Sequence, residues 1–163
     1  MAKKVAYLGL GNMGGAMAAN LAKAGFEVHG YDPSPESRAR AEKAGIKIFA
    51  TAAEAASGVD VICSSVPETS HVEAAYLGET GALSSAPEGA VCFDFSTITV
   101  EGSQGVANEA QKQGIHFLDT PVSGSVPHAK AGTLAIIAGG DKTALDAHRD
   151  VLDAIGEAAG IDF

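Results

Sequence analysis

The fold of this 163-residue chain is decided by the stretch Leu8-Gly9-Leu10-Gly11-Asn12-Met13-Gly14. It contains the pattern G-x-G-x-x-G between a short β-rich run and an Ala-rich run. In a strand–turn–helix unit, the first glycine permits a tight turn, the second lets the backbone approach a pyrophosphate, and the third allows close helix–strand packing. Phosphate oxygens then meet free N–H groups at the positive end of the helix dipole. The stretch therefore predicts a dinucleotide-binding loop.

The glycine pattern alone is weak evidence in a chain with 20 glycines, so the residues after it matter. Asp32 ends the second predicted strand, 18 residues after Gly14. There a carboxylate accepts hydrogen bonds from the adenosine ribose hydroxyls and would repel the 2′-phosphate of NADP. The other role open to Asp32 is to cap the helix that follows it.

No arginine stands directly beside Asp32, since residues 33–35 are Pro-Ser-Pro. NAD is therefore the predicted cofactor and NADP the alternative. Arg38 and Arg40 keep that alternative open, although a solvated helix face is the use we expect for both.

Short β-rich runs alternate with Ala-rich runs along the whole chain. The predicted strands carry few charges and show no strict alternation, which is typical of a parallel sheet covered on both faces. They are Val5–Leu8, Glu27–Tyr31, Lys47–Phe49, Val59–Ser64, Val91–Phe95, Ile115–Leu118 and Leu134–Ala138.

The runs between these strands have helical character. Met13, Met17 and Leu21 form one apolar stripe at helical spacing, and Gly25, Gly45 and Gly114 stand at positions suited to left-handed C-caps. The predicted helices are Met13–Ala24, Pro35–Ala44, Ala52–Ser57, His71–Leu77, Val100–Gln113 and Lys142–Ile155. Residues 1–163 are thus expected to form one dinucleotide-binding domain of the α/β class. Its predicted fold is Rossmann-type and doubly wound, with a mostly parallel sheet and helices on both faces.

Composition and charge exclude several other classes. The formal net charge of −9 and the sequence pI near 4.9 argue against nucleic acid or a membrane surface as the main partner. No apolar run approaches the roughly 18 residues that span a bilayer, and a cytoplasmic location is expected. Cys63 and Cys92 lie in apolar runs without metal-ligand spacing, so we expect two buried thiols, no metal site and no disulfide.

Three segments, in order, carry a resemblance to a known family. They are the extended loop GLGNMGGAMAANL at residues 9–21, Asp-Phe-Ser-Thr-Ile at residues 94–98, and Asp-Thr-Pro-Val-Ser-Gly-Ser at residues 119–125, the last followed by Ala129, Gly132, Thr133 and Leu134. Together they resemble the β-hydroxyacid dehydrogenases, the group that includes 3-hydroxyisobutyrate dehydrogenase and tartronate semialdehyde reductase. The resemblance covers the whole chain and identifies it as the NAD-binding domain of such an enzyme.

The resemblance also implies roles for individual residues. Ser123, Gly124 and Ser125 are expected to bind a substrate carboxylate through hydroxyl and backbone N–H groups. The cofactor-binding residues expected from the loop and the resemblance are Gly9, Leu10, Gly11, Asn12, Met13, Gly14, Asp32, Val66, Pro67 and Thr97.

Two departures from the family pattern concern the substrate segment. Ser125 and His128 each stand where the family often has glycine, and the serine version is similar to the glyoxylate and succinic semialdehyde reductase branch. These departures bear on which substrate is bound, a small β-hydroxy acid or a semialdehyde. His128 and Lys130 could also reach a substrate acid group.

The family's general acid/base is a lysine in a G-x-x-G-x-G-x-x-x-K-x-x-x-N segment, and the sequence ends at Phe163 before such a segment. No catalytic residue is therefore assigned. We expect the chain to bind NAD but to be inactive alone, and the full-length enzyme to be a homo-oligomer. The alternatives are half of an NADPH-dependent glyoxylate or succinic semialdehyde reductase, a non-catalytic nucleotide-binding module and, less favoured, a phosphogluconate dehydrogenase half-domain.

Overall fold

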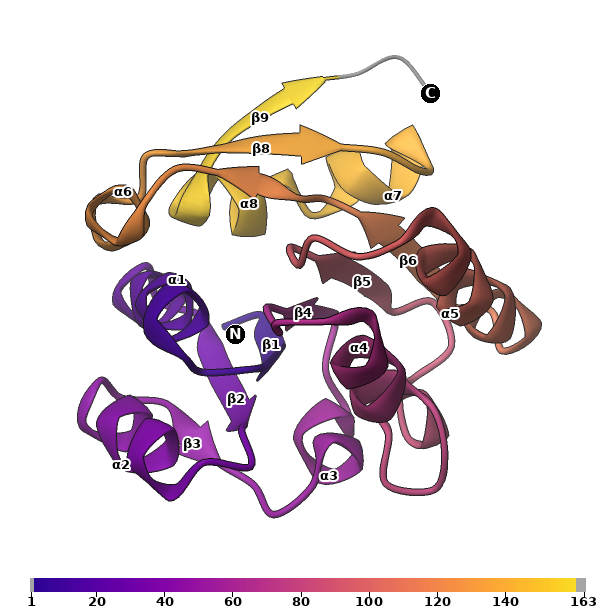
Figure 1. The fold of residues 1–163 in the computed structure, drawn as a ribbon, viewed down its shortest axis with the longest axis horizontal. Coiled ribbons are helices and arrows are strands. Elements are labelled where there is room, and N and C mark those ends of the chain that lie inside the picture. The colour runs from indigo at the N-terminus through magenta and orange to yellow at the C-terminus, as the bar shows by residue number, and fades with distance from the viewer. Residues whose placement is uncertain (1, 161–163) are drawn as a thin grey trace.

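The computed structural model describes residues 2–160, and a six-stranded parallel sheet forms its centre (Figure 1). The strands lie in the order β3-β2-β1-β4-β5-β6, and every neighbouring pair is parallel. Their bounds are β1 Lys4–Leu8, β2 Glu27–Tyr31, β3 Lys47–Ile48, β4 Val61–Ser64, β5 Val91–Asp94 and β6 His116–Asp119. This order confirms the predicted Rossmann-type, doubly wound fold.

Helices cover both faces of this sheet, as predicted. Helices α1 (Asn12–Lys23) and α2 (Pro35–Lys43) pack on one face, and α3 (Ala52–Ala56), α4 (Thr69–Tyr76) and α5 (Val100–Lys112) pack on the other. In α1, Met17 and Leu21 are fully buried and Met13 packs beside them, which confirms the predicted apolar stripe. The three glycines predicted as C-caps have φ of +98°, +91° and +73°. A 3₁₀ turn at Ala82–Ser84 was not predicted.

The last quarter of the chain forms a second sheet, which the sequence did not predict. Its order is β7-β8-β9, with β7 (Val122–Ser123) antiparallel and β9 (Gly156–Gly160) parallel to β8 (Leu134–Ala138). The strand at residues 134–138 was expected, but in the main sheet; it lies instead in this small one. Helix α6 (Val126–Ala131) joins β7 to β8 and was also not predicted.

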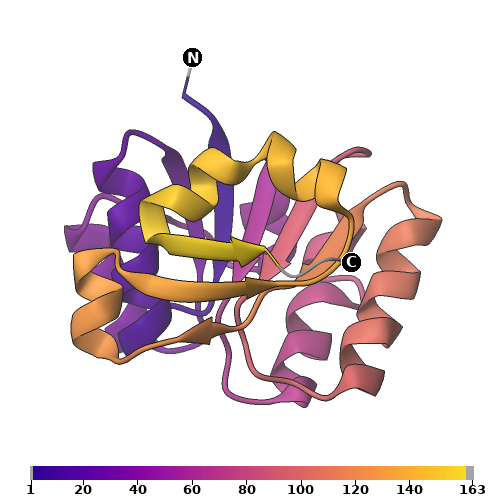
Figure 2. The same cartoon turned by 90° about the horizontal axis from the view of Figure 1, so that it is seen from above.

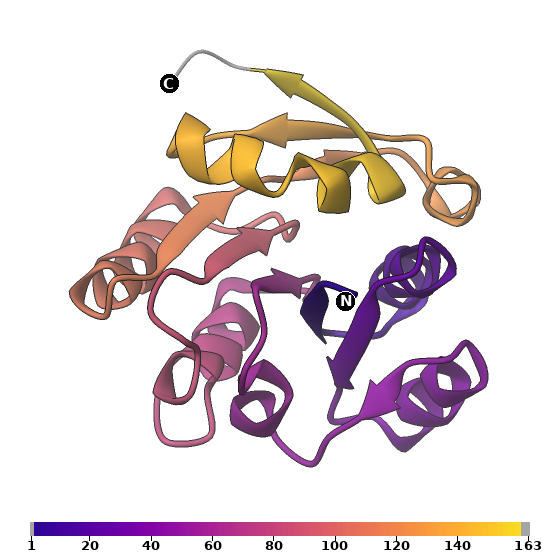
Figure 3. The same cartoon turned by 180° about the vertical axis from the view of Figure 1, so that it is seen from behind.

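The helix predicted over residues 142–155 is two helices. Residues Lys142–Ala147 form α7 and Arg149–Ile155 form α8, with the break at His148, whose φ and ψ are −127° and 29°. Figure 3 shows both helices between the small sheet and the main one, and Figure 2 shows β8 and β9 crossing over the main strands. Buried side chains of α8 belong to the same apolar cluster as those of α1. The small sheet and its helices therefore complete the cover of one face.

The two sheets are joined where β6 ends. Asp119 forms an isolated bridge with Gly139, and the N–H of Ile137 donates a 2.9 Å hydrogen bond to the carbonyl oxygen of Pro121. Cys63 and Cys92 are fully buried and unbonded, and burial raises the pKa of both thiols. Within residues 2–160 there is no cluster of three metal-ligating side chains, and no helix there is long and apolar enough to cross a bilayer.

Candidate functional site

A cleft of about 860 Å³ opens at the carboxyl ends of β1, β2, β4 and β5. The chain crosses from one side of the sheet to the other between β1 and β4, and in doubly wound folds ligands bind beside such a switch point. Nine of the ten predicted cofactor residues line this cleft: Gly9, Gly11, Asn12, Met13, Gly14, Asp32, Val66, Pro67 and Thr97. The tenth, Leu10, is fully buried beneath the loop.

The loop between β1 and α1 requires glycine at its two ends. Gly9 has a φ of +94°, and a Cβ there would overlap the carbonyl oxygen of Ser65. A Cβ on Gly14 would overlap the carbonyl oxygen of Gly9. The loop therefore packs directly against β4 and against its own first residue, which is possible only without side chains at these positions.

Gly11 serves a different purpose, because a Cβ built there would meet nothing within 4 Å. It is the N-cap of α1, and no side chain hydrogen-bonds to the N–H groups of the first turn. Those groups have no acceptor within the helix either. The helix thus presents backbone donors and its positive dipole end to open space in the cleft, which fits a pyrophosphate.

Asp32 ties the second strand to this loop. The residue is 9% exposed; its Oδ2 accepts a 2.7 Å hydrogen bond from the N–H of Leu10, and Oδ1 accepts one of 2.8 Å from the N–H of Ser34. The N-cap of α2 is Ser34, whose side chain accepts from the N–H of Ser37, so the alternative helix-capping role for Asp32 is wrong. The carboxylate is instead held at the edge of the cleft.

The two arginines that follow bind backbone carbonyls; Arg40 lies on an exposed helix face, as expected, and Arg38 is half-buried. Arg38 donates to the carbonyl oxygens of Asp32 and Pro33, at 3.0 and 3.3 Å. Arg40 donates to the carbonyl oxygen of Leu10, at 3.1 Å. Both guanidinium groups therefore hold the ends of the loop and of β2 in place.

Behind Val66 and Thr97 lies a buried hydrogen-bond network that the sequence did not predict. Ser96 Oγ accepts a 2.8 Å hydrogen bond from the N–H of Val66. Asp94 Oδ1 accepts hydrogen bonds from Ser64 Oγ at 2.9 Å and from the N–H of Ser96 at 3.1 Å, and Ser64 Oγ lies 2.7 Å from the Tyr76 hydroxyl.

Asp94 itself is fully buried at the end of β5, and its Oδ2 has no hydrogen-bond partner among residues 2–160. Burial raises the pKa of this carboxyl to about 6, although the hydrogen bonds from Ser96 and Ser64 oppose the rise and Asp119 adds to it. A carboxyl that titrates near neutral pH thus stands directly behind one wall of the cleft.

The predicted substrate segment lies beside the cleft and not in its lining. Val122, which precedes these residues, lines the cleft. Ser123, Gly124 and Ser125 follow it on an exposed turn between β7 and α6. The N–H of Ser125 donates a 3.2 Å hydrogen bond to His128 Nδ1, which also lies 2.8 Å from Ser125 Oγ.

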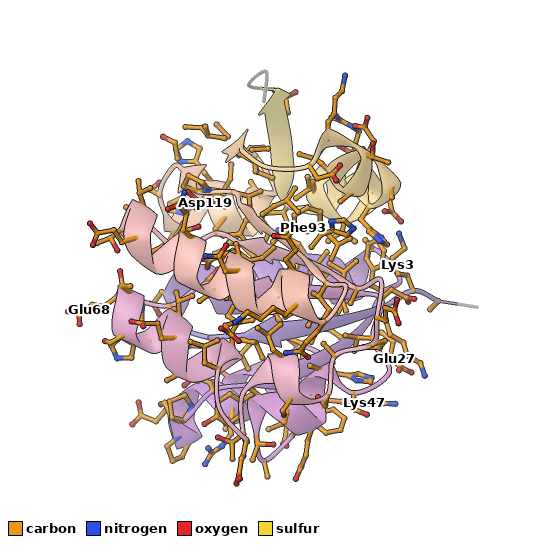
Figure 4. The ribbon with its side chains drawn as sticks, turned by 90° about the vertical axis from the view of Figure 1, so that its right-hand side faces the viewer. Lys3, Glu27, Lys47, Glu68, Phe93 and Asp119 are labelled. Carbon is orange, nitrogen blue, oxygen red and sulfur yellow. The ribbon has the colours of Figure 1, made fainter. Side chains whose placement is uncertain are left out.

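Several residues that line the cleft were not predicted as site residues from the sequence. They include Tyr31, Ser65, Phe95 and His71, which is exposed on α4. The spacing of His71 after Pro67, at the start of an Ala-rich helix, is the only signal that could have indicated it. Figure 4 shows Glu68, which precedes α4, and Asp119 at the cleft end of the sheet, with Lys3, Glu27 and Lys47 at the opposite end.

Comparison with known proteins agrees with this geometry. A family model described as the NAD binding domain of 6-phosphogluconate dehydrogenase matches residues 4–161. The chain is 41% identical to a 3-hydroxyisobutyrate dehydrogenase and 36% identical to an NAD-dependent L-serine dehydrogenase, both of Pseudomonas aeruginosa; it aligns over 93% and 94% of its own length. It covers 51% and 52% of those proteins, so it spans about half the length of these relatives.

A solved structure shows the same fold. The 3-hydroxyisobutyrate dehydrogenase of Mycobacterium tuberculosis with L-serine superimposes with a TM-score of 0.91 at 37% identity, over 98% of this chain and 54% of that one. The cleft, the loop and these matches together lead to one assignment. The chain belongs to the family of the NAD binding domain of 6-phosphogluconate dehydrogenase, as an NAD-binding domain of the 3-hydroxyisobutyrate dehydrogenase-like oxidoreductases.

Proposed function

We propose that this chain is the cofactor-binding half of an enzyme that transfers hydride between NAD and a small β-hydroxy acid. One observation carries the proposal: the open space at Gly11 and the Asp32 carboxylate lie in the same cleft. A diphosphate beside the first and an adenosine ribose beside the second are adjacent parts of one dinucleotide. When bound, the nicotinamide ring accepts or donates the hydride.

The chain's own residues orient the cofactor in this proposal. The first-turn N–H groups of α1 bind the pyrophosphate, and the two oxygens of Asp32 use their remaining lone pairs for the ribose hydroxyls. Thr97 and Val66 lie further along the cleft, where the nicotinamide end is expected to bind. Phe95 and Pro67 give that end of the cleft apolar walls.

NAD is the proposed cofactor, in preference to NADP. The carboxylate of Asp32 stands where the 2′-phosphate would enter, and the nearby Arg38 is engaged with two backbone carbonyls. One of the relatives is named as NAD-dependent. The competing reading is half of an NADPH-dependent semialdehyde or glyoxylate reductase, for which Arg38 would have to leave those carbonyls.

For the substrate, we propose that Ser123, Gly124 and Ser125 hold the carboxylate of a β-hydroxy acid or semialdehyde. The turn is exposed, follows the cleft-lining Val122, and carries hydroxyl and N–H groups without a net charge; the N–H of Ser125 would have to leave His128 Nδ1 to reach the substrate. The relatives named for 3-hydroxyisobutyrate and L-serine are consistent with substrates of that class. No nucleic acid or membrane is proposed as a partner.

In this proposal, cofactor binding and proton transfer are carried out by different parts of the full-length enzyme. No lysine lines the cleft within residues 2–160, and proton exchange with a substrate hydroxyl needs a donor within hydrogen-bond reach. We therefore propose that the 163-residue chain binds cofactor without turnover, and that a lysine elsewhere in the full-length enzyme supplies the proton. For that enzyme we propose a cytoplasmic homo-oligomer.

Titration with NAD⁺, NADH, NADP⁺ and NADPH tests the cofactor proposal. We expect saturable binding of the two NAD forms and at least about tenfold weaker binding of the two NADP forms. Tighter binding of NADPH would support the reductase alternative. Steady NADH production from L-serine or 3-hydroxyisobutyrate by the purified chain would contradict the proposed division of labour, and a full-length enzyme that also lacks turnover would favour a non-catalytic module.

A further inference from the structure

The buried network behind the cleft connects residues that come from three separate elements. Asp94 at the end of β5 accepts hydrogen bonds from Ser64 at the end of β4 and from Ser96, and Ser96 in turn accepts from Val66. Tyr76 on α4 closes the network through Ser64. One carboxyl group therefore determines where two consecutive strand ends place the cleft wall.

The wall held in this way includes residues at the proposed nicotinamide end. Val66, Ser96 and Thr97 all line the cleft, and Asp94 lies directly behind them with no exposed surface. Its Oδ2 makes no hydrogen bond, so the charge of the ionised form is only partly compensated. Because the carboxylate is buried, water screens little of the effect that its partly compensated charge has on the cleft.

We infer that Asp94 is a positioning residue which fixes the nicotinamide wall of the cleft and, through its negative charge, makes this chain bind oxidised cofactor in preference to reduced cofactor. The inference rests on the proposed binding of a nicotinamide dinucleotide and extends it. The oxidised nicotinamide ring carries a positive charge and the reduced ring is neutral, so a buried carboxylate behind the ring stabilises only the oxidised form. Protonation of Asp94 removes this preference.

The neighbours of Asp94 leave few other sources for such an effect. Tyr7 on β1, Tyr76 on α4 and Cys92 on β5 face the carboxyl, and burial raises the pKa of all three, so they stay neutral around pH 7. Asp119 on β6 is paired with Asp94 in register and is half-buried, and burial raises its pKa as well. His71 also lines the cleft, and comparison of variants separates its contribution because Asp94→Asn leaves His71 in place.

Asp94→Asn is the direct test. The amide oxygen can still accept from Ser64 and from the N–H of Ser96, but the side chain no longer titrates. Glu101→Gln is the matched control, because it removes the same charge from an exposed position in the first turn of α5. Dissociation constants for NAD⁺ and NADH are measured for the wild type and both variants at about pH 5.5 and about pH 8.

In the wild type, the ratio of the NADH to the NAD⁺ dissociation constant should rise about fivefold between the two pH values. The rise should persist in Glu101→Gln and vanish in Asp94→Asn. A ratio independent of pH in the wild type, or an equal rise in Asp94→Asn, would overturn the inference. Absence of any cofactor binding by the wild type would instead overturn the proposed function.

A second variant keeps the test decisive if Asp94→Asn does not fold. Ser64→Ala removes one hydrogen bond that lowers the pKa of Asp94, so the midpoint of the ratio's pH dependence should move to higher pH. An unchanged midpoint in folded Ser64→Ala would show that another group causes the pH dependence.

Discussion

The carboxylate of Asp32 accepts a 2.7 Å hydrogen bond from the backbone N–H of Leu10, which joins the end of β2 to the middle of the glycine loop. The same group therefore shapes the loop and faces the cleft. Loop geometry and ribose recognition depend on one side chain, because a carboxylate can accept more than one hydrogen bond on each oxygen.

Asp32→Asn should change both cofactor preference and stability. An amide retains one acceptor oxygen and can serve only one of the N–H groups of Leu10 and Ser34, so unfolding should become easier by about 1–2 kcal/mol. Binding of NAD⁺ should weaken roughly tenfold. The affinity for NADP⁺ should fall by less or should rise, because the charge that repels its 2′-phosphate is gone. Urea unfolding and calorimetry with both nucleotides measure the two effects. Equal losses for both nucleotides would argue against a role in discrimination.

Alanine at Gly11 and at Gly14 should separate binding from folding. A Cβ at Gly11 enters open cleft space, so Gly11→Ala should fold with nearly unchanged stability but bind dinucleotide at least about tenfold more weakly. A Cβ at Gly14 overlaps a backbone carbonyl, so Gly14→Ala should lose about 2–3 kcal/mol of unfolding free energy.

Gly105→Ala is the control for both, since Gly105 lies inside α5 with open space around it. It should raise the unfolding free energy by roughly 0.5–1 kcal/mol and leave binding unchanged. A Gly11→Ala protein that binds cofactor as well as this control would place the pyrophosphate elsewhere.

The contribution of His148 to the unfolding free energy should fall when the pH drops below about 6.5. Burial, together with the nearby Lys3, lowers the pKa of His148, and Lys3 Nζ donates a 3.0 Å hydrogen bond to its Nδ1. Between the lowered native pKa and the unfolded value, the unfolded chain binds more protons, so stability rises with pH through that window. Asp94, whose pKa is raised to about 6, acts with the opposite sign, so the two contributions must be separated by mutation.

His148→Gln should therefore flatten the acid side of the stability profile. Urea unfolding at several pH values compares this variant with the wild type. An identical slope in both proteins between about pH 5 and about pH 6.5 would show that His148 does not contribute.

Asn20 on α1 should hold α6, the helix that follows the proposed substrate-binding turn at residues 123–125, in place. Its Nδ2 donates to the carbonyl oxygens of Ala129 and Lys130, at 2.8 and 3.4 Å, and so holds α6 against α1. Asn20→Ala should cost about 1 kcal/mol and speed amide hydrogen exchange in residues 126–131. Exposed Gln111→Ala on α5 is the control, and equal exchange in both variants would contradict the anchor.

The main sheet could be predicted because most of its strands belong to short β-rich runs that alternate with Ala-rich helical runs. The small sheet could not, since β7 begins only three residues after the end of β6 and β9 reads Gly-Glu-Ala-Ala-Gly, a poor β-forming sequence. Its pairing depends on β8, whose Leu134 and Ile136 bury one face against the core. The break between α7 and α8 at His148 could not be predicted either, because no proline or glycine lies there.

The candidate site divides in the same way. The glycine loop and Asp32 follow local chemistry, and the structure places them in one cleft. The contacts among Ser64, Tyr76 and Asp94 join side chains from β4, α4 and β5, so no sequence spacing reveals them. Ser123, Gly124 and Ser125 lie outside the cleft lining, and their position also depends on the small sheet, in which Ser123 ends β7.

The proposed binding site is tested most directly by mapping nicotinamide dinucleotide onto the folded chain through its backbone amide NMR signals. On titration with NAD⁺, we expect saturable shifts concentrated at residues 9–14, Asp32, Val66 and Thr97, with little change at the opposite end of the sheet near Lys47. Saturable shifts confined to other surfaces, or no shifts at millimolar NAD⁺ or NADH, would contradict it.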